Sequence, residues 1–277
     1  MTDQTRTLAD LGVTHLNGLV SPSLRGRLNA DIDGWIDEFE PAEQAAVFTS
    51  SGRHLEQQQF FLASARNVSC FLESDALDDQ GQLNCEKAVA INKIGHALHD
   101  FSGAFAELAQ LPALVHQLRQ QSDEPWELMQ SMVIMKPPRI GGEVNWHQDG
   151  TFLIDAQQRC MGIWIALEDA NEDNGCLQFG DTPPQGLCSL FETDHLSGET
   201  QMRSLTDALR PPEHPILAPC HAGDAVIFDG LTPHASSPNR SSKSRRAITL
   251  HFKPAASDWA PTNWLQRDSL PRFLVNQ

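Results

Sequence analysis

Several familiar signals are missing from this chain of 277 residues. Its six cysteines form no Cys-x-x-Cys pair, which argues against zinc-finger and thioredoxin-type sites. No stretch of about 18 apolar residues occurs that would cross a membrane. No apolar run follows the first residues, so we expect no secretory signal. These absences together predict a cytoplasmic protein with free thiols.

Basic residues are scarce, since 20 Lys and Arg stand against 36 Asp and Glu and give a net charge of −16. Such a charge repels phosphate backbones and anionic membrane surfaces. We therefore predict no nucleic-acid or membrane partner, and make no prediction of oligomeric state. A coenzyme A thioester is disfavoured on the same ground, although Arg203, Arg210 and the run 240–246 offer local cations.

The Gly-x-Ser-x-Gly signature of serine hydrolases is also absent. Asp194-His195 and Cys220-His221 place an imidazole beside an acid or a thiol, but neither pair stands in a hydrolase motif. A hydrolase is therefore disfavoured.

The first half of the chain is predicted to be mostly helical. Ser21-Pro22 is a helix start, with serine as the N-cap and proline in the first turn. Apolar residues then recur at helical spacing, at Leu24, Leu28, Ile32, Trp35, Ile36 and Phe39. A second helical block is expected over 87–121, broken near Ser102-Gly103 and at Pro112. Residues 67–73, between the two blocks, are expected to form a strand.

From about Met129 onward, short apolar runs alternate with clusters of Gly, Pro, Asn and Asp, which is typical of a β-sandwich or barrel. The runs are 131–135, 161–167, 176–179, 225–228 and 247–252. We predict a mainly β fold with flanking α-helices, in which residues 1–277 form a single domain and the helical half packs on a β-core of about 129–254. A helical domain followed by a separate β domain is the alternative, but no linker-like stretch divides the two.

The segment 180–219 is long, carries six prolines and lies between two strand-like runs. Long loops inside compact domains are usually functional, and lids screen an active site from water when they close. We predict a lid over 180–219 with Gly186 and Gly198 as pivots. A passive surface insertion is the alternative.

The sharpest local feature is His147-Gln148-Asp149. Residues i and i+2 of a strand point to one face, so His147 and Asp149 can present an imidazole and a carboxylate side by side. A third ligand is needed, and His234 is the best placed because it follows the strand-like run 225–228. Two histidines and one carboxylate with open positions are the ligand set of non-heme Fe(II) oxygenases. A lone His-x-Asp is more often a surface pair, so the metal interpretation depends on all three residues.

Arg245 lies eleven residues after His234 and precedes the apolar run 247–252. A guanidinium beside a metal site is suited to bind a ligand carboxylate through two parallel hydrogen bonds. Ser236 shares the face of His234 in a strand and can offer a hydroxyl to the same carboxylate. A solvated loop is the alternative, because Arg245 stands in a stretch rich in Ser, Arg and Lys.

These residues stand in longer motifs that resemble the phytanoyl-CoA dioxygenase family of Fe(II)/2-oxoglutarate oxygenases. The segments that carry the resemblance are 142–149, 162–170 with 174–177, and 234–245, and further matching stretches are 91–99, 130–132 and 259–266. The likeness runs from about Phe60 to Pro271, which is most of the chain.

The resemblance implies a double-stranded β-helix, a relative of the jelly roll, flanked by helices. It implies an Fe(II) site formed by His147, Asp149 and His234. It also implies a 2-oxoglutarate site in which Arg245 and Ser236 hold the distal carboxylate, with a cosubstrate pocket lined by Lys93, Met132 and Trp164. Family members usually carry Pro-Gly-Ser-His where this chain has 178–184, so the pocket rim and the substrate stay open.

Structural roles compete with some of these assignments. Lys93, His96 and Asp100 fall at helical spacing, which would place them on an exposed polar face. Met132 and Trp164 suit a hydrophobic core without any cofactor. His251 is expected to pack in the core or line the rim rather than bind metal.

The predicted function is an Fe(II)- and 2-oxoglutarate-dependent dioxygenase that uses O2 to hydroxylate a C–H bond of a small organic substrate and releases succinate and CO2. Asp149 argues against halogenation, because related halogenating oxygenases lack the carboxylate ligand. One alternative is a non-catalytic metal- or 2-oxoglutarate-binding protein or sensor on the same fold. Another is a cupin-like metalloenzyme that uses no 2-oxoglutarate, against which Arg245 and Ser236 argue.

Overall fold

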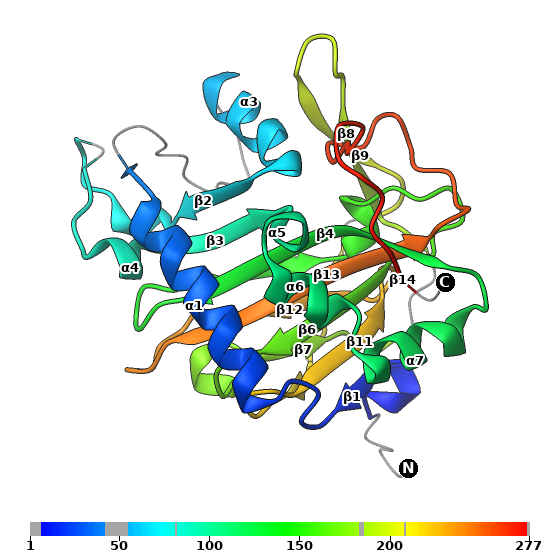
Figure 1. Cartoon of the computed structure of the whole chain (residues 1–277), viewed down its shortest axis with the longest axis horizontal. Helices are drawn as coiled ribbons and strands as arrows, with labels where there is room; N and C mark the ends of the chain where they lie inside the picture. Colours follow the sequence, from blue (N-terminus) through cyan, green and yellow to red (C-terminus); the bar gives the residue numbers. More distant parts are fainter. Residues whose placement is uncertain (1–6, 42–54, 81, 183–185, 208, 276–277) are drawn as a thin grey trace.

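The structure, a computed structural model, describes residues 7–41, 55–80, 82–182, 186–207 and 209–275. Within these ranges the strands pair into two main sheets and one hairpin, and helices cover one side (Figure 1). The predicted mainly β fold with flanking helices is confirmed. No helix in these ranges is long and apolar enough to cross a membrane, and all six cysteines carry free thiols.

The larger sheet has the strand order β1-β11-β6-β13-β4-β3-β2, with β14 beside β4. Its members are β1 (Thr14–Leu16), β11 (Ala225–Asp229), β6 (Met161–Ala166), β13 (Arg245–Pro254), β4 (Trp126–Lys136), β3 (Ile91–His96), β2 (Val68–Leu72) and β14 (Leu274–Val275). β13 and β4 are antiparallel and pair along their whole length, from Arg245 opposite Lys136 to Pro254 opposite Trp126. Most of the apolar runs seen in the sequence lie in this sheet.

The smaller sheet has the order β10-β7-β12-β5, and its strands are β10 (Ile216–Ala218), β7 (Leu177–Phe179), β12 (His234–Ser236) and β5 (Val144–His147). Apolar side chains of the two sheets meet in one buried cluster, in which Trp164 and Phe228 of the larger sheet join Leu177 and Phe179 of the smaller one. Two antiparallel sheets packed over a shared core form the jelly roll that the sequence predicts.

Helices cover the outer face of the larger sheet, and α1 crosses this face diagonally (Figure 1). α1 (Pro22–Glu38) begins after Ser21, whose hydroxyl accepts a hydrogen bond from the Leu24 amide at 3.2 Å. Its buried face contributes to the core on this side through Leu24, Leu28, Ile32 and Ile36. The other helices are α3 (Leu55–Ala63), α4 (Lys87–Ala90), α5 (Leu98–Phe101), α6 (Gly103–Ala109) and α7 (Pro112–Gln121), with short 3-10 turns η1 (Ala9–Leu11), η2 (Ser64–Arg66), η3 (Ser74–Ala76), η4 (Asp149–Thr151) and η5 (Glu172–Asn174).

Residues 91–96 correct the sequence prediction of a helical block over 87–121, which placed breaks only near Ser102-Gly103 and at Pro112. They form β3, because this segment pairs with a strand on each side and buries Ile91 and Ile94. Tertiary pairing outweighs local spacing here. Lys93 and His96 therefore share no helical face with Asp100, which lies on α5.

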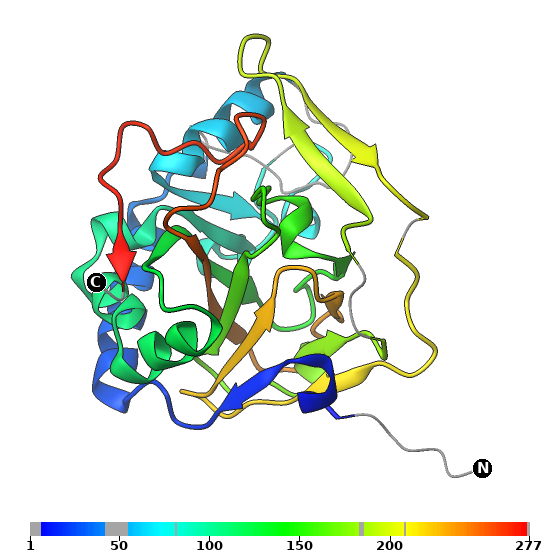
Figure 2. The same ribbon diagram turned by 90° about the vertical axis from the view of Figure 1, so that its right-hand side faces the viewer.

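The segment 180–219 is also more ordered than the predicted loop. It contains β8 (Ser189–Thr193) and β9 (Thr200–Ser204), which pair as a hairpin, and then β10. Figure 2 shows this hairpin rising at the same end of the molecule as α3. Residues 183–185 and 208 of the predicted lid lie outside the described residues.

Candidate metal centre

Three side chains from the smaller sheet and its adjoining turn converge at one point. β5 ends at His147, β12 begins at His234, and these two residues are direct partners in the antiparallel pairing of the strands. Asp149 opens η4, and Gln148 before it is still extended (φ −117°, ψ 132°). The alternation of side chains therefore continues past the end of β5 and brings Asp149 to the side of His147.

The ligand atoms of these side chains all lie within 4.8 Å of one another. Asp149 Oδ1 is 3.6 Å from His147 Nε2 and 3.6 Å from His234 Nε2. Ligands bound about 2.1 Å from one metal ion at right angles stand ~3 Å apart, so the cluster fits a metal ion after a small contraction. Among the described residues, no other group of three or more metal-ligating side chains of this kind occurs.

Backbone carbonyls orient both imidazoles. His147 Nδ1 donates to Asn145 O at 2.8 Å, and His234 Nδ1 donates to Thr232 O at 3.0 Å. A carbonyl oxygen only accepts, so each Nδ1 carries a proton, and Nε2 is the ring nitrogen that faces Asp149. Metal-binding histidines are oriented in the same way, with the second ring nitrogen held by a hydrogen bond.

The buried charges suit a cation. Burial lowers the pKa of His234 to about 4, helped by the neighbouring His147, so this imidazole is neutral at pH 7. Burial alone opposes ionisation of Asp149, but the nearby imidazoles, His251 foremost, hold its pKa well below the usual range. His234 therefore presents a neutral imidazole and Asp149 a carboxylate, the protonation states of metal ligands.

His251 is a member of the site that sequence reasoning assigned to packing or the rim. Its Nε2 lies 3.1 Å from Asp149 Oδ2, whereas His147 and His234 lie 3.6 Å from the other oxygen, Oδ1. Gly162, opposite His251 in β6, leaves room for this carboxylate, because a Cβ there would stand 2.6 Å from Asp149 Oδ2. The alternation of Arg245, Ala247, Thr249 and His251 along β13 is the sequence signal that places His251 on the inner face.

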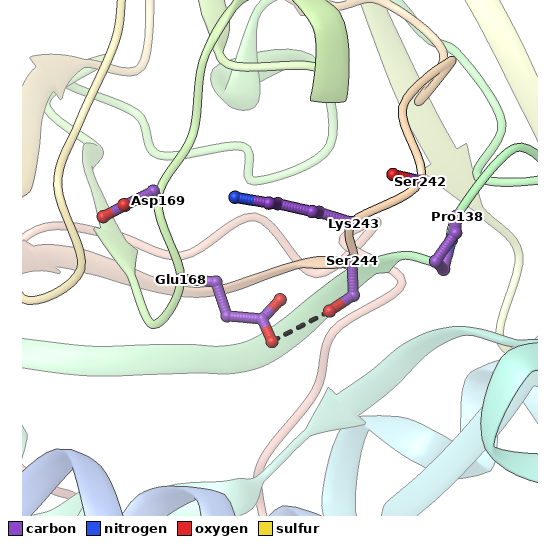
Figure 3. A pocket seen from close by; sticks show the side chains of 6 residues that line it. All are labelled: Pro138, Glu168, Asp169, Ser242, Lys243 and Ser244. Carbon is purple, nitrogen blue, oxygen red and sulfur yellow. Dashed lines mark hydrogen bonds between the residues drawn. The ribbon is translucent and has the colours of Figure 1, made fainter.

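Arg245 opens β13 with its side chain only 1% exposed. Glu168 holds the backbone on either side of Arg245, because its carboxylate accepts from Ser244 Oγ at 2.9 Å and from the Arg246 amide at 2.9 Å. The Arg245 side chain is thereby kept pointing inward. Figure 3 draws the Ser244 bond in the surface hollow that Glu168 helps to line. Arg246 points outward and donates to Asp33 Oδ1 at 2.6 Å. Arg245 thus lies inside the barrel and not in a solvated loop.

The Arg245 guanidinium has unused donors. Nη2 donates to Ser236 Oγ at 3.4 Å, and Cζ stands 5.5 Å from the centre of the Trp164 ring. Nε and Nη1 have no hydrogen-bond partner among the described residues. Burial lowers the pKa of Arg245 to about 10, so it stays charged at pH 7. A buried cation with two unused donors fits the carboxylate of an absent ligand.

Lys136, directly opposite Arg245 on β4, is a second buried cation that sequence reasoning missed. Its Nζ donates to Gly142 O and, at 3.4 Å, to Ser236 O. Burial, reinforced by the charge of Arg245, lowers the pKa of Lys136 to about 7. The buried region where β13 begins and β4 ends therefore holds one permanent positive charge, on Arg245, and one titratable positive charge, on Lys136.

The other predicted pocket residues line up on neighbouring strands of the larger sheet. Thr249 on β13 is paired with Met132 on β4 and with Trp164 on β6, which places the three in one row. Lys93 lies on β3 opposite Ile134, one row nearer to Arg245. Trp164 also belongs to the core between the sheets, so the same side chain packs in the core and lies beside Arg245.

Aromatic rings extend from the metal-ligand cluster toward the hairpin. Phe152 is 6.1 Å from the ring of His147 and 5.6 Å from Phe191 of β8. The ring centre of Phe191 in turn lies 6.3 Å from that of Phe61 on α3. The Phe61 ring also stacks on Trp264, with 4.2 Å between the ring centres. The side of the site under the hairpin is therefore apolar.

Solved structures share this fold. The epimerase SnoN in complex with Fe3+, alpha ketoglutarate and nogalamycin RO superposes with a TM-score of 0.63 at 14% identity, covering 95% of this chain and 88% of SnoN. EctD from S. alaskensis with bound Fe gives a TM-score of 0.58 at 18% identity, covering 98% and 85%. The fold of this chain is thus the jelly roll that SnoN and EctD share.

Sequence relatives identify the family. The model of the phytanoyl-CoA dioxygenase (PhyH) family matches residues 10–247. Phytanoyl-CoA dioxygenase 1 of Oryza sativa subsp. japonica is 35% identical over 260 residues, covering 91% of this chain and 87% of the rice protein. Phytanoyl-CoA dioxygenase domain-containing protein 1 of Danio rerio is 34% identical, covering 96% and 95%. The chain belongs to the phytanoyl-CoA dioxygenase family, as its motifs predict.

Proposed function

We propose that the protein is an Fe(II)- and 2-oxoglutarate-dependent dioxygenase that hydroxylates a C–H bond of a small organic substrate. The observation that carries this proposal is the convergence of His147, Asp149 and His234 with both Nε2 atoms free to ligate. The two unused donors of the Arg245 guanidinium support the role of 2-oxoglutarate as cosubstrate, because they can bind its carboxylate. Relatives named as phytanoyl-CoA dioxygenases and a neighbour crystallised with Fe3+ and alpha ketoglutarate agree with it.

Each residue has a defined task in this proposal. His147, Asp149 and His234 would hold Fe(II), while Arg245 and Ser236 would bind the distal carboxylate of 2-oxoglutarate. Lys93, Met132 and Trp164 would line the cosubstrate pocket. Bound together, the metal and cosubstrate supply the oxidation, in which O2, 2-oxoglutarate and the C–H bond yield succinate, CO2 and a hydroxylated product. The apolar surroundings exclude water from the reaction.

The described part of 180–219 is proposed as a lid on the substrate side. Phe191 on β8 reaches Phe152 beside the metal cluster, and the hairpin tip exposes Leu196 completely. Gly186 and Gly198 have positive φ angles of 139° and 77°, which suits the proposed pivots. Cleavage by protease within 189–204 should slow when metal, cosubstrate and a turned-over substrate are present. Unchanged cleavage would leave the hairpin a passive insertion.

The test of the function combines binding with turnover. Fe(II) and 2-oxoglutarate binding is measured anaerobically, and succinate release is then followed with a panel of small organic substrates and coenzyme A thioesters. Binding of both without succinate on any substrate supports the non-catalytic alternative. Metal binding without 2-oxoglutarate binding supports a cupin-like enzyme that does not use it.

The ligand assignment has its own test. His147→Ala, Asp149→Ala and His234→Ala should each abolish Fe(II) binding or turnover while circular dichroism stays native. Activity like that of the unmodified protein in any variant removes that residue from the ligand set.

A further inference from the structure

Gln148 lies between two of the proposed metal ligands and faces away from them. Because its backbone is extended, its side chain points to the side opposite His147 and Asp149. It is nevertheless buried, with 1% of its surface exposed. A buried amide needs partners for two donors and one acceptor.

The amide of Gln148 finds all its partners on two other segments. Nε2 donates to Gly186 O at 2.8 Å and to Leu231 O at 2.7 Å, and Oε1 accepts from the Cys188 amide at 2.9 Å. Gly186 and Cys188 precede β8, so they form the base of the hairpin. Leu231 belongs to the turn that leads into His234.

Close packing reinforces this junction. Gly150 N donates to Gly230 O at 2.9 Å, which joins η4 to the turn before His234. A Cβ at Gly150 would lie 2.9 Å from Leu187 Cδ2, so the hairpin base rests directly on η4. The segments 148–150, 186–188 and 230–232 therefore meet behind the metal cluster.

We infer that Gln148 is a positioning residue that couples the placement of the β8–β9 hairpin to the geometry of the metal ligands. This inference rests on the proposed metal-binding function. One amide holds the hairpin base, the turn before His234 and the His147–Asp149 segment in fixed relation. Because such coupling is reciprocal, metal binding restrains the hairpin, and a loosened hairpin base weakens metal binding.

The experiment uses the full chain and Co(II) as the metal probe, with absorbance titration for affinity and limited proteolysis for the hairpin. Gln148→Met keeps the approximate side-chain length but removes all three hydrogen bonds. We expect its Co(II) affinity to fall roughly 10- to 100-fold, as when other partners behind metal ligands are removed. We also expect Co(II) to slow hairpin cleavage in the unmodified protein but not in this variant.

Gln110→Met is the matched control, because Gln110 also donates to a backbone carbonyl, Ala106 O at 3.3 Å, but at the end of α6 on the outer face of the larger sheet. It should leave Co(II) affinity and the protection of the hairpin unchanged. Leu187→Ala loosens the hairpin base without touching Gln148, and it should weaken Co(II) binding several-fold. If Gln148→Met does not fold, Leu187→Ala decides with the same readouts.

Two results overturn the inference in different ways. Unchanged Co(II) affinity in Gln148→Met and Leu187→Ala means that the hairpin is anchored but not coupled to the ligands. An unmodified chain that binds no Co(II) removes the proposed metal function, and the coupling with it.

Discussion

His251 Nε2 lies 3.1 Å from Asp149 Oδ2, whereas Asp149 Oδ1 faces the imidazoles of His147 and His234. The two oxygens of one carboxylate therefore have different neighbours. A carboxylate held in this way offers a single oxygen to a metal and cannot rotate freely.

Replacing His251 should weaken metal binding without removing a ligand. His251→Leu leaves Asp149 without its partner, and we expect the affinity for Fe(II) or Co(II) to fall roughly 10- to 100-fold. Anaerobic titration measures the change, and His116→Leu at an exposed position of α7 is the control. An affinity equal to that of the unmodified chain shows that β5 and η4 orient Asp149 by themselves.

Gly162 should tolerate no side chain. In Gly162→Ala the new Cβ would stand 2.6 Å from Asp149 Oδ2 and 2.9 Å from Phe228 Cε2. The carboxylate or the strand has to move, so we expect metal binding to be lost and stability to fall by about 1–3 kcal/mol. Gly34→Ala in α1 is the control, because a Cβ there meets nothing within 4 Å. Metal titration and urea unfolding test both variants, and tight binding by Gly162→Ala contradicts the placement of Asp149.

Arg245 should determine the affinity for 2-oxoglutarate. A lysine keeps the charge but not the planar pair of donors, so Arg245→Lys should lose about 2–4 kcal/mol of binding, roughly a 30- to 700-fold loss of affinity. Arg246→Lys changes the neighbouring guanidinium, which binds Asp33 on the outer face, and should have little effect. Isothermal titration of the metal-loaded chain separates the two. A larger loss of 2-oxoglutarate affinity in Arg246→Lys than in Arg245→Lys would make Arg246 the residue that binds the carboxylate.

Lys136 should make stability depend on pH. Its pKa is about 7 in the folded chain, against an ordinary value of 10.5, so between these values the unfolded chain binds more protons. The free energy of unfolding contributed by this group therefore rises from pH 7 to about pH 10.5, and the penalty for burying the charge is complete below pH 7. Lys136→Met lacks this dependence. Urea unfolding of both chains across this range measures it, with the exposed Lys243→Met as control.

The expected pattern is specific. The stability of the unmodified chain relative to Lys136→Met should increase steadily as the pH is raised from 7 toward 10. Parallel pH profiles would mean that Lys136 keeps its proton in the folded chain.

The sequence predicted the parts of the site that depend on neighbours along the chain. His147 and Asp149 follow from a two-residue alternation, and His234 with Ser236 from the same alternation on another strand. Lys136 and His251 depend on strand register, since Lys136 faces Arg245 more than a hundred residues later in the chain. Such pairings leave no local pattern. β3 was missed for a related reason, because Lys93 and His96 happen to stand at helical spacing while their hydrogen bonds go to β2 and β4.

The site is divided between the two sheets, and this division has a consequence for motion. His147 and His234 belong to the smaller sheet, whereas Arg245, Lys136 and His251 belong to the larger one. A ligand that touches both groups adds to the apolar packing and to the hydrogen bonds from Arg245 and Lys136 to Ser236 that already join the two layers. Its binding energy then opposes their separation. Amide hydrogen exchange in β12 and β13 should therefore slow together when the metal and cosubstrate bind, because the two sheets then open in one concerted motion and not independently.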